Sequence, residues 1–575
     1  MSNKLFSPNK SLHVGREGFD LSKRVLFTST TGQLLPIYNK LLEPGDHFEI
    51  NVASLTRMQP MNTAAFARID EHFDFFFVPC SDIWRFYNDW RMSIPDAPFS
   101  YKKSGDSALY DNVPSTLPKV AYSALFNKLV QLEGQGNDEL GQKKVLGTQR
   151  LFSLLGYGTD NFFDHNEGRT HSDPTQEVGN TPVNIFPLLV YQKIYQDFYR
   201  NSQWENQDSA SFNVDWFASS SNEYVFDSLP DNVCKLRYSN LKKDYFLGLS
   251  PSTQYGSVSV VLSGIDLVSP ENVSGTTIYE TPLSTAAGRQ TILTTTSTSD
   301  SVARRLLSYT NILSVRQAEA LQRWKEVYML NGKRFKEQVK AMYGVDVPER
   351  RNRRTVFIDG FSNTMSIGEV VATASGDAGG DITTKSVLGQ IAGKGMSATN
   401  NGNVIKFDNN DEFGYIMCIY HIEPRLDYEA YGIHPDLQMT DLEDFYNPAY
   451  DKIGLSPVRE LALSSEGVTD NNIIGYGPRY LNYKTDFDVI TGVFCNPFNN
   501  NMMKAWITPY DYARRQSYKD GSLFSFWDMK VSPHDLDNIM AVPFQGFTAI
   551  DDPFLVNCNF DIKAVRNMSA NTLPY

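Results

Sequence analysis

Cysteine and histidine side chains are the first candidates for nucleophilic or metal chemistry in this chain. The five cysteines lie far apart and form no CxxC pair: Cys80, Cys234, Cys418, Cys495 and Cys558. An odd, sparse set is typical of a chain that folds in a reducing compartment, not of a disulfide framework. The histidine before Cys80 in the sequence, His72, belongs to the same predicted strand, and nothing orients it as a base. We therefore expect Cys80 to be a buried structural thiol.

A histidine-containing loop holds the residue types of a metal site: Asp164, His165, His171 and Asp173. Zinc sites usually need four well-spaced ligands, often with cysteines among them, and no cysteine is near this loop. A solvated loop is the favoured interpretation.

The acidic stretch Asp408–Glu412 (DNNDE) resembles a calcium loop in composition. An EF-hand is excluded because Phe413 stands where the sharp turn of that loop requires glycine. A looser surface calcium site stays open, but we predict neither a metal site nor a cofactor.

The motifs of common enzymes are missing or incomplete. Residues 389–395 (GQIAGKG) approach a phosphate-binding loop, but three residues separate the glycines where four are needed, and Gly395 replaces the hydroxyl residue that would hold magnesium. We expect a tight turn there. No G-x-S-x-G or H-E-x-x-H motif occurs, and the carboxylates show no recognisable pairing. The sequence therefore predicts a protein that is not an enzyme.

Short basic runs are the strongest candidates for a binding function. Charged side chains beside aromatic ones hold single-stranded nucleic acid without sequence preference. Arginine suits carboxylate pairs between subunits equally well, so that alternative stays open. Three arginine runs stand out: Arg304–Arg305, residues 350–354 and Arg514–Arg515. We select nucleic-acid contact candidates from the N-terminus and from the run at residues 350–354. They are Lys4, Lys10, Arg350, Arg351, Arg353 and Arg354.

The elements that must position these groups read mainly as strands. In residues 68–79, Phe73, Phe75 and Phe77 alternate with polar side chains, which predicts a strand with one dry face. Pro79 should end its pairing, and Ser81 should cap a short helix with Trp84 and Trp90 on it. The phenylalanines are interpreted as core, not as a platform for bases.

Two later segments carry equally clear strand patterns. Residues 413–422 (FGYIMCIYHI) are apolar without alternation, as in a strand buried on both faces. Residues 554–563 alternate, with inward side chains predicted at Phe554, Val556, Cys558, Phe560 and Ile562.

Residues 311–344 form the clearest helical passage. Leu321, Trp324 and Tyr328 recur at helical spacing, and Asn331–Gly332 breaks the helix before a second run that ends at Gly344. Other parts are less regular. We read 1–25 as an extended basic arm, 96–182 as a long inserted connection with one helix near residues 121–132, and 254–301 as a surface-projecting insertion.

The length and net charge of the chain limit the class of protein that it can be. A chain of 575 residues is ample for a large core, and 13% aromatic residues favour strands and long loops. The net charge of −13 argues against a protein that coats nucleic acid over its whole surface, but leaves room for one basic face. No signal peptide or apolar run long enough to span a bilayer is seen, so we expect no membrane insertion.

Several stretches together resemble the major capsid protein of the microviruses, small icosahedral phages with circular single-stranded DNA, and most closely the gokushovirus-like branch. The resemblance rests on motifs in a fixed order: FDLS, GQLLPIY, EPGDHFEI, RMQPM, HFDFFFVPCSDIW, KDYF, AEALQRWKEVYMLNGKRFKEQVKAMYGV, GQIAGKG, EPRLDYEAYGIHPDLQ, YGPRYLNYK and KAVRNMSANTLPY. It covers most of the chain and fails mainly in residues 96–182 and 254–301.

The resemblance implies a fold and a set of partners. The fold would be mainly β, a single eight-stranded antiparallel jelly-roll β-sandwich over residues 1–575, with long loop insertions that contain helices. Many copies would self-assemble into an icosahedral shell around the genome, with a pilot or small DNA-binding protein as a further virion partner. Assembly would take place in the host bacterial cytoplasm, and the shell would present a surface to a host receptor.

A different class remains as the alternative, a receptor- or glycan-binding β-sandwich protein of a phage. A glycan-active domain should show a cleft with paired carboxylates and stacking tryptophans. The seven tryptophans here lie mostly in helical or strand-core patterns, which favours the capsid interpretation.

Overall fold

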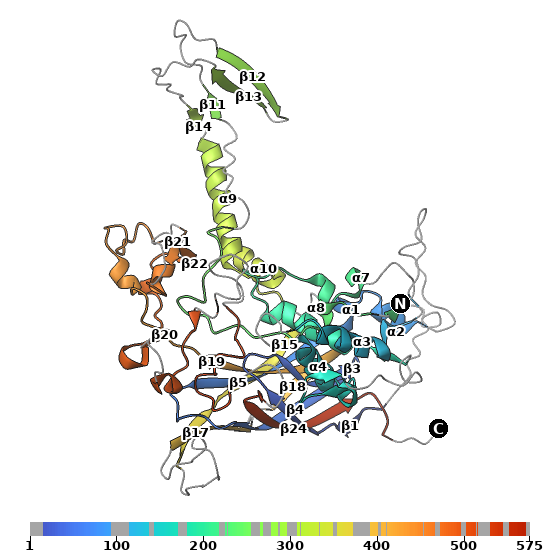
Figure 1. Ribbon diagram of the computed structural model, residues 1–575. Helices are drawn as coiled ribbons and strands as arrows, with labels where there is room; N and C mark the ends of the chain where they lie inside the picture. The colour runs from blue at the N-terminus through green and yellow to red at the C-terminus, as the bar shows by residue number, and fades with distance from the viewer. Residues whose placement is uncertain are drawn as a thin grey trace, which may run out of the picture.

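The larger of two facing sheets has seven strands and is centred on a long antiparallel pair near the two ends of the chain (Figure 1). From one edge to the other its strands are β1 (Glu17–Asp20) and β2 (Lys23–Ser29), then β24 (Phe554–Arg566), β4 (Asp46–Met58), β18 (Ile405–Asn409) and β17 (Ile391–Asn400), and last β16 (Ser366–Val371). The computed structural model describes residues 15–93, 114, 116–136, 143–170, 181–217, 225–226, 228–254, 265–267, 278–285, 288–295, 308–310, 312–332, 334–348, 354–371, 391–400, 404–409, 411–451, 454–465, 472–495, 502–512, 515, 529–543 and 551–570.

The second sheet has four antiparallel strands: β15 (Val356–Thr364), β5 (Arg68–Pro79), β19 (Gly414–Arg425) and β3 (Leu35–Leu42). The central strand β19 is almost wholly buried, as its unbroken apolar sequence predicts. The alternation predicted for β24 is confirmed, because Phe554, Cys558 and Ile562 are buried while Asn559 and Lys563 are exposed. The protein is therefore mainly β, with antiparallel sheets packed as a sandwich.

Aromatic side chains from both sheets meet in the main core. Phe27 of β2 contacts Tyr420 of β19 edge to face, with ring centroids 5.3 Å apart. Tyr38 of β3 lies against Phe560 of β24 at 5.4 Å. Such pairs contribute about 0.5–1.5 kcal/mol each beyond the area that they bury. The rings thus fix how the two sheets sit on each other.

The β5 strand carries the dry face that its sequence predicts. Phe73, Phe75 and Phe77 are buried, and the strand ends at Pro79. The predicted cap at Ser81 is wrong, because the helix α1 (Cys80–Ile83) already begins at the residue after Pro79. A second short helix, α2 (Tyr87–Met92), follows. Pro79 occupies the cap position in an extended conformation, and no side chain caps the helix.

Helices cover the outer face of the four-stranded sheet (Figure 1). They are α3 (Tyr122–Glu133), α4 (Lys144–Leu155), α6 (Phe186–Ile194) with a π-helical turn at Tyr195–Tyr199, α7 (Val214–Phe217) and α8 (Asp231–Cys234). Short strands lie among them: β6 (Lys119–Ala121), β7 (Phe163–Asp164), β8 (Arg169–Thr170), β9 (Pro182–Asn184) and β10 (Val225–Phe226).

The α4 helix corrects the interpretation of residues 96–182 as a polar connection with a single helix. The predicted helix is present as α3, but α4 was not foreseen, and it packs on β3. Leu146, Leu151 and Phe152 of α4 are fully buried. This part of the chain therefore supplies core as well as connection.

A long helix rises from the sandwich and carries two small sheets (Figure 1). It is α9 (Ile312–Leu330), and α10 (Phe335–Tyr343) lies at its foot, ending at Gly344 in the left-handed region with φ 69°. The small sheets are β11 (Ile265–Leu267) with β14 (Ser308–Thr310), and β12 (Ile278–Thr285) with β13 (Gly288–Thr295). The helical passage predicted over 311–344 is confirmed as α9 and α10. We call α9, α10 and the strands that α9 carries the stalk.

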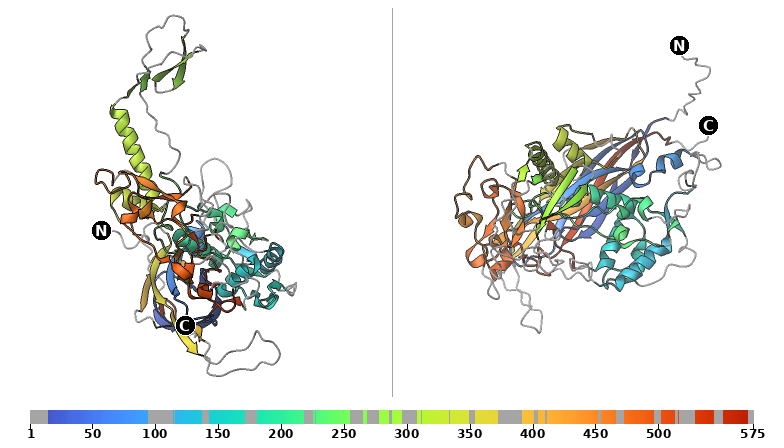
Figure 2. Two further views of the ribbon diagram at one scale, coloured as in Figure 1. Left: turned by 60° about the vertical axis from the view of Figure 1, so that its left-hand side comes forward. Right: turned by 90° about the horizontal axis from the view of Figure 1, so that it is seen from above.

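Residues 426–543 add a further part that the sequence did not predict, with a second core that it shares with residues 241–249. Seen from above in Figure 2, it lies on the opposite side of the sandwich from α3 and α4. Its strands are β20 (Tyr428–Glu429), β21 (Leu455–Arg459), β22 (Ile473–Pro478) and β23 (Val489–Ile490), joined by 3₁₀ turns. Phe246, Tyr428 and Phe487 form its aromatic centre.

The N-terminal segment is described only from residue 15 onward, so most of the predicted arm lies outside the described residues. From Glu17 it is extended and paired with β24, first as β1 and then as β2. In the part of the chain that the structure describes, no helix is both long and apolar enough to cross a bilayer.

Candidate functional surfaces

The stretch that approached a phosphate loop is a strand. Residues 391–395 belong to β17, so the tight turn that we expected there is wrong for this part. A Cβ atom on Gly393 would lie 2.0 Å from the carbonyl oxygen of Thr63, and one on Gly395 would lie 2.1 Å from the sulfur of Met58. These glycines allow β17 to pack closely against β4 and against the segment that follows β4.

All five cysteines are free and buried. Burial raises the pKa of the Cys80 thiol and raises that of Cys234 to about 12. A thiol with a raised pKa is a poor nucleophile because so little of it is thiolate at neutral pH. The prediction that Cys80 is a structural thiol is therefore confirmed.

His72 does have partners, which corrects the expectation that nothing orients it. It pairs directly across the strands with His421, and the two rings stack with centroids 4.8 Å apart. Glu423 follows on the same face of β19, with Oε1 3.1 Å from Nε2 of His421 and Oε2 3.9 Å from Nε2 of His72. Asp74 completes the group, 3.9 Å from Nδ1 of His421.

The electrostatics of this group follow from burial and from the two carboxylates. Burial lowers the pKa of His421, but Glu423 and Asp74 outweigh burial and leave that pKa above the ordinary histidine value. Burial and the neighbouring His421 together lower the pKa of His72. The pKa values of the two stacked histidines are therefore shifted in opposite directions, and His421 is protonated more readily than His72.

The basic candidates are mostly outside the described residues, including Lys4, Lys10, Arg350, Arg351 and Arg353, as well as Arg304, Arg305 and Arg514. Arg354 is described and exposed, with its guanidinium 6.0 Å from the ring of Phe335 in α10. Arg515 is only 3% exposed and forms an ion pair with Asp535 at 2.7 Å. Arg515 belongs to a run that we noted but did not select as a nucleic-acid contact, and its charge is used inside the protein.

The other candidate ligand groups are dispersed. Asp408 lies in β18 and pairs with His47 of β4. His165 lies 3.4 Å from Asp160, while His171 and Asp173 fall outside the described residues. Among the described residues, the group of His72, His421 and Glu423 is the one set of three whose ligand atoms all lie within 4.8 Å of one another.

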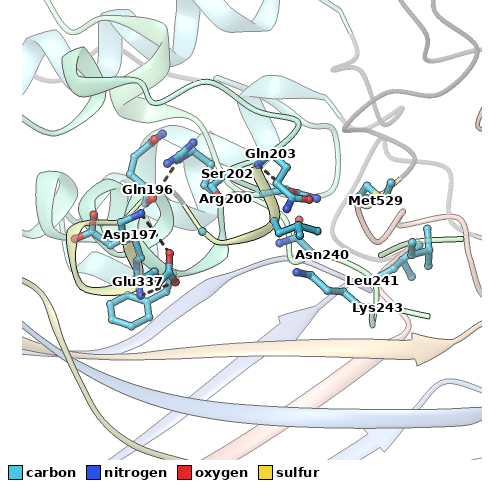
Figure 3. A pocket seen from close by; sticks show the side chains of 16 residues that line it. Gln196, Asp197, Arg200, Ser202, Gln203, Asn240, Leu241, Lys243, Glu337 and Met529 are labelled. Carbon is cyan, nitrogen blue, oxygen red and sulfur yellow. Dashed lines mark hydrogen bonds and ion pairs between the residues drawn. The ribbon is translucent and has the colours of Figure 1, made fainter. Parts of the chain in front are cut away.

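A polar pocket of about 270 Å³ lies where the turn between α9 and α10 meets the π-helical turn (Figure 3). Three of its charged side chains are engaged with protein groups. Arg200 donates to the carbonyl oxygen of Glu205 at 2.6 Å, and Asp197 pairs with Lys193 at 3.3 Å. Arg334 lies 4.0 Å from the ring of Phe198. The contact between Arg334 and Phe198 thus joins the foot of the stalk to the sandwich.

Large apolar side chains stay exposed on the stalk and on the 426–543 part. On α9 and α10, Trp324 is 52% exposed and Phe335 is 50% exposed. On the 426–543 part, Leu442 is 90% exposed, with Phe445 and Tyr446 close by in the sequence. Large exposed apolar patches are typical of surfaces that contact other proteins.

These observations define a structural protein of the β-sandwich class, with a large core, inert thiols and uncovered apolar surface. The chain matches the capsid protein (F protein) family over residues 7–120 and 160–574. It belongs to this family, and it is a structural, non-enzymatic capsid protein of the microvirus type.

Three similar proteins are each named capsid protein VP1. That of Chlamydia phage 1 is 22% identical over 621 residues, covering 100% of this chain and 98% of the relative. That of Bdellovibrio phage phiMH2K is 22% identical, covering 86% of each chain. That of Spiroplasma virus 4 is 21% identical, covering 85% of this chain and 84% of the relative. The resemblance drawn from the sequence motifs is thereby confirmed.

Sequence reasoning missed the partners of His72 because His421 and Glu423 belong to β19, a strand far from β5 in the chain. A weak signal was present in HFDF and in YHIEP, two strand patterns that each place a histidine two residues from a carboxylate on one face. Only the pairing of β5 with β19 brings the two patterns together.

Proposed function

We propose that the sandwich is an eight-stranded jelly roll. The strand order supports this, if β16, β17 and β18 count as one interrupted position. One sheet then runs β2, β24, β4, β16–β18 and the other runs β3, β19, β5, β15. In chain order the first four strands alternate between the sheets, which is the arrangement of two interleaved Greek keys.

We further propose that copies of this chain associate into a closed icosahedral shell. The observation that carries this proposal is the exposed apolar side chains of α9 and α10, typified by Trp324 and Phe335. Leaving such side chains in water does not stabilise a monomer, whereas full burial of each one contributes about 1.5–3 kcal/mol of favourable free energy. Many identical contacts related by closed symmetry turn that gain into a stable shell.

The enclosed cargo is proposed to be a circular single-stranded DNA genome. With a net charge of −13, the chain repels DNA overall, so contact has to be local. Lys4 and Lys10 are the proposed contacts, with a small basic virion protein as a further neutralising partner.

Arg354 is in a different position, because it lies beside α10 at the foot of the stalk. We propose that the stalk points outward from the shell, because it carries the insertion that was predicted to project from the surface. A genome contact at Arg354 is incompatible with this direction, since the genome lies inside the shell. We therefore propose that Arg354, and with it Arg350, Arg351 and Arg353, serves contacts between subunits. The end of the stalk is the proposed attachment surface for a host receptor.

The DNA proposal is tested by extracting nucleic acid from nuclease-treated particles of the full chain. We expect DNA that a single-strand-specific nuclease degrades once the shell is opened. A double variant Lys4→Gln with Lys10→Gln should package less DNA, while Arg354→Gln should package the normal amount. If Arg354→Gln reduces packaging and the double variant does not, then Arg354 faces the genome and Lys4 and Lys10 do not, which contradicts the proposal.

A further inference from the structure

The group formed by His72, His421 and Glu423 has the composition of a metal site. Two imidazoles and one carboxylate are the ligand set of catalytic and labile zinc sites, with the fourth position left to water. The three side chains come from two adjacent strands, β5 and β19, at the directly paired positions His72 and His421 and at Glu423, two residues further along. We propose that this group binds one divalent transition metal ion of the zinc type.

The distances are close to those that a metal requires. Ligand atoms at about 2.0–2.1 Å from a tetrahedral ion lie about 3.3 Å from one another. Nε2 of His421 and Oε1 of Glu423 are 3.1 Å apart already. Nε2 of His72 is 3.9 Å from Oε2 of Glu423, and the His72 ring is stacked at 12° to the ring of His421. The His72 ring therefore has to turn out of this stack for both ring nitrogens to face one ion.

The surroundings of His421 supply a second, independent indication. Its side chain is 5% exposed, and its Nδ1 atom is buried without a hydrogen-bond partner at normal distance. Metal-binding histidines donate their second ring N–H to a carboxylate, which fixes the ring. Asp74 stands in that position, with Oδ2 3.9 Å from Nδ1 of His421.

Asp74 is itself held in place. The hydroxyl of Tyr199 donates to Asp74 Oδ2 at 2.6 Å, and the Tyr199 ring packs edge to face on His421 at 5.4 Å. Tyr199 belongs to the π-helical turn, an irregularity that is frequent at functional sites. The chain Tyr199, Asp74, His421 therefore has the order of outer partner, carboxylate and ligand found around zinc.

One side of the group is open. The His72 side chain is 27% exposed and that of Glu423 is 22% exposed, whereas His421 is enclosed. An ion can enter from that side and keep a water as its fourth ligand. Once bound, it would link the two central strands of the four-stranded sheet.

The test uses the purified full chain, stripped with a chelator and titrated with Co²⁺ and then Zn²⁺. We expect one Co²⁺ per chain with the visible absorption of a tetrahedral site, displaced by one equivalent of Zn²⁺. His72→Gln and Glu423→Gln should each weaken binding about tenfold or more, and Asp74→Asn should weaken it without changing the stoichiometry. His165→Gln, which alters an exposed histidine beside Asp160, is the matched control and should bind normally.

Failure of the wild-type chain to take up one ion overturns the proposal, whatever the variants do. Uptake that persists unchanged in both His72→Gln and Glu423→Gln overturns it as well. Thermal unfolding supplies a check on folding: Zn²⁺ should raise the Tm of the stripped wild-type chain and of His165→Gln, but not that of His72→Gln.

Discussion

Arg150 and Asp552 form a buried ion pair between positions 402 residues apart. Nη2 of Arg150 lies 2.5 Å and 2.6 Å from the two carboxylate oxygens of Asp552. Asp552 is fully buried and also accepts hydrogen bonds from Thr28 and Thr30. The pair therefore connects α4 to the start of β24 and to the N-terminal strand β2.

Replacing Arg150 with methionine should lower the free energy of unfolding by about 3–5 kcal/mol, because it leaves the Asp552 carboxylate buried without its cation. Urea unfolding followed by fluorescence measures the change. Arg169→Met removes an exposed pair with Glu167 and is the matched control, with an expected cost below about 1 kcal/mol. Equal costs for the two variants would show that the buried pair is not important for stability.

Glu71 is a second buried carboxylate, located between the two sheets. Its oxygens accept from Thr56 at 2.7 Å, Ser397 at 2.5 Å and Tyr420 at 3.2 Å. Glu71→Gln puts an amide donor against these hydroxyl donors and should cost about 1–3 kcal/mol. Glu49→Gln, at an exposed carboxylate beside Lys406, should cost much less in the same urea titration. A Glu71→Gln variant as stable as the wild type would contradict this role.

The thiols should be unreactive in the native chain. All five cysteines are buried, and burial raises the pKa of Cys80, Cys418 and Cys558. We expect almost no reaction with a thiol-specific disulfide reagent at pH 8, and reaction of five thiols per chain once urea is added. Fast labelling of a native cysteine would indicate that the helix or strand that holds it opens locally.

Lys530 should make stability depend on pH in a defined way. Burial lowers its pKa to about 8, although Glu205 at 3.7 Å opposes the shift. Between pH 8 and the ordinary lysine value of 10.5, the unfolded chain holds one proton more than the folded chain, so this group adds stability as the pH rises. Its contribution reaches at most about 1.4 kcal/mol per pH unit.

The measurement compares the wild type with Lys530→Met between pH 8 and 9.5. The buried cysteines act with the opposite sign, because their raised pKa values make stability fall as the pH rises, but they act equally in both chains. The wild type should therefore gain stability relative to Lys530→Met across this range. If the stability difference between the wild type and Lys530→Met stays constant with pH, the pKa of Lys530 lies outside this pH range.

The exposed face of the stalk should govern assembly and not folding. Trp324→Glu and Phe335→Glu should leave the unfolding midpoint of the isolated subunit almost unchanged and reduce particle yield strongly, because a charge at a buried contact costs several kcal/mol. Lys340→Gln, at an exposed lysine of α10, is the control and should assemble normally. Normal particle yield from both glutamate variants would place the contact surface elsewhere.

The strands were predictable from sequence wherever one chemical pattern decides the structure. Alternation in β24 and the apolar run of β19 each determine burial along a single strand, and both predictions are confirmed. The break after Asn331 and the end at Gly344 were equally local.

Features that depend on distant partners were not predictable. Helix α4 was missed because Thr148, Gln149 and Arg150 look solvent-facing, yet all three are buried. Thr148 and Arg150 are hydrogen-bonded to distant residues, and Gln149 to Thr159, ten residues further on. The partners of His72 were missed for the same reason, since His421 is brought to it only by strand pairing. Long-range pairing carries the information that short sequence windows lack.

The most direct test of the account is the particle formed by the full chain expressed alone. Electron microscopy and sedimentation of the purified protein should show closed icosahedral shells or the pentamers from which they are built. The variants Trp324→Glu and Phe335→Glu should sediment as subunits under the same conditions. A wild-type chain that stays a monomer or a discrete trimer at all concentrations would contradict the proposal that it assembles on its own into the shell.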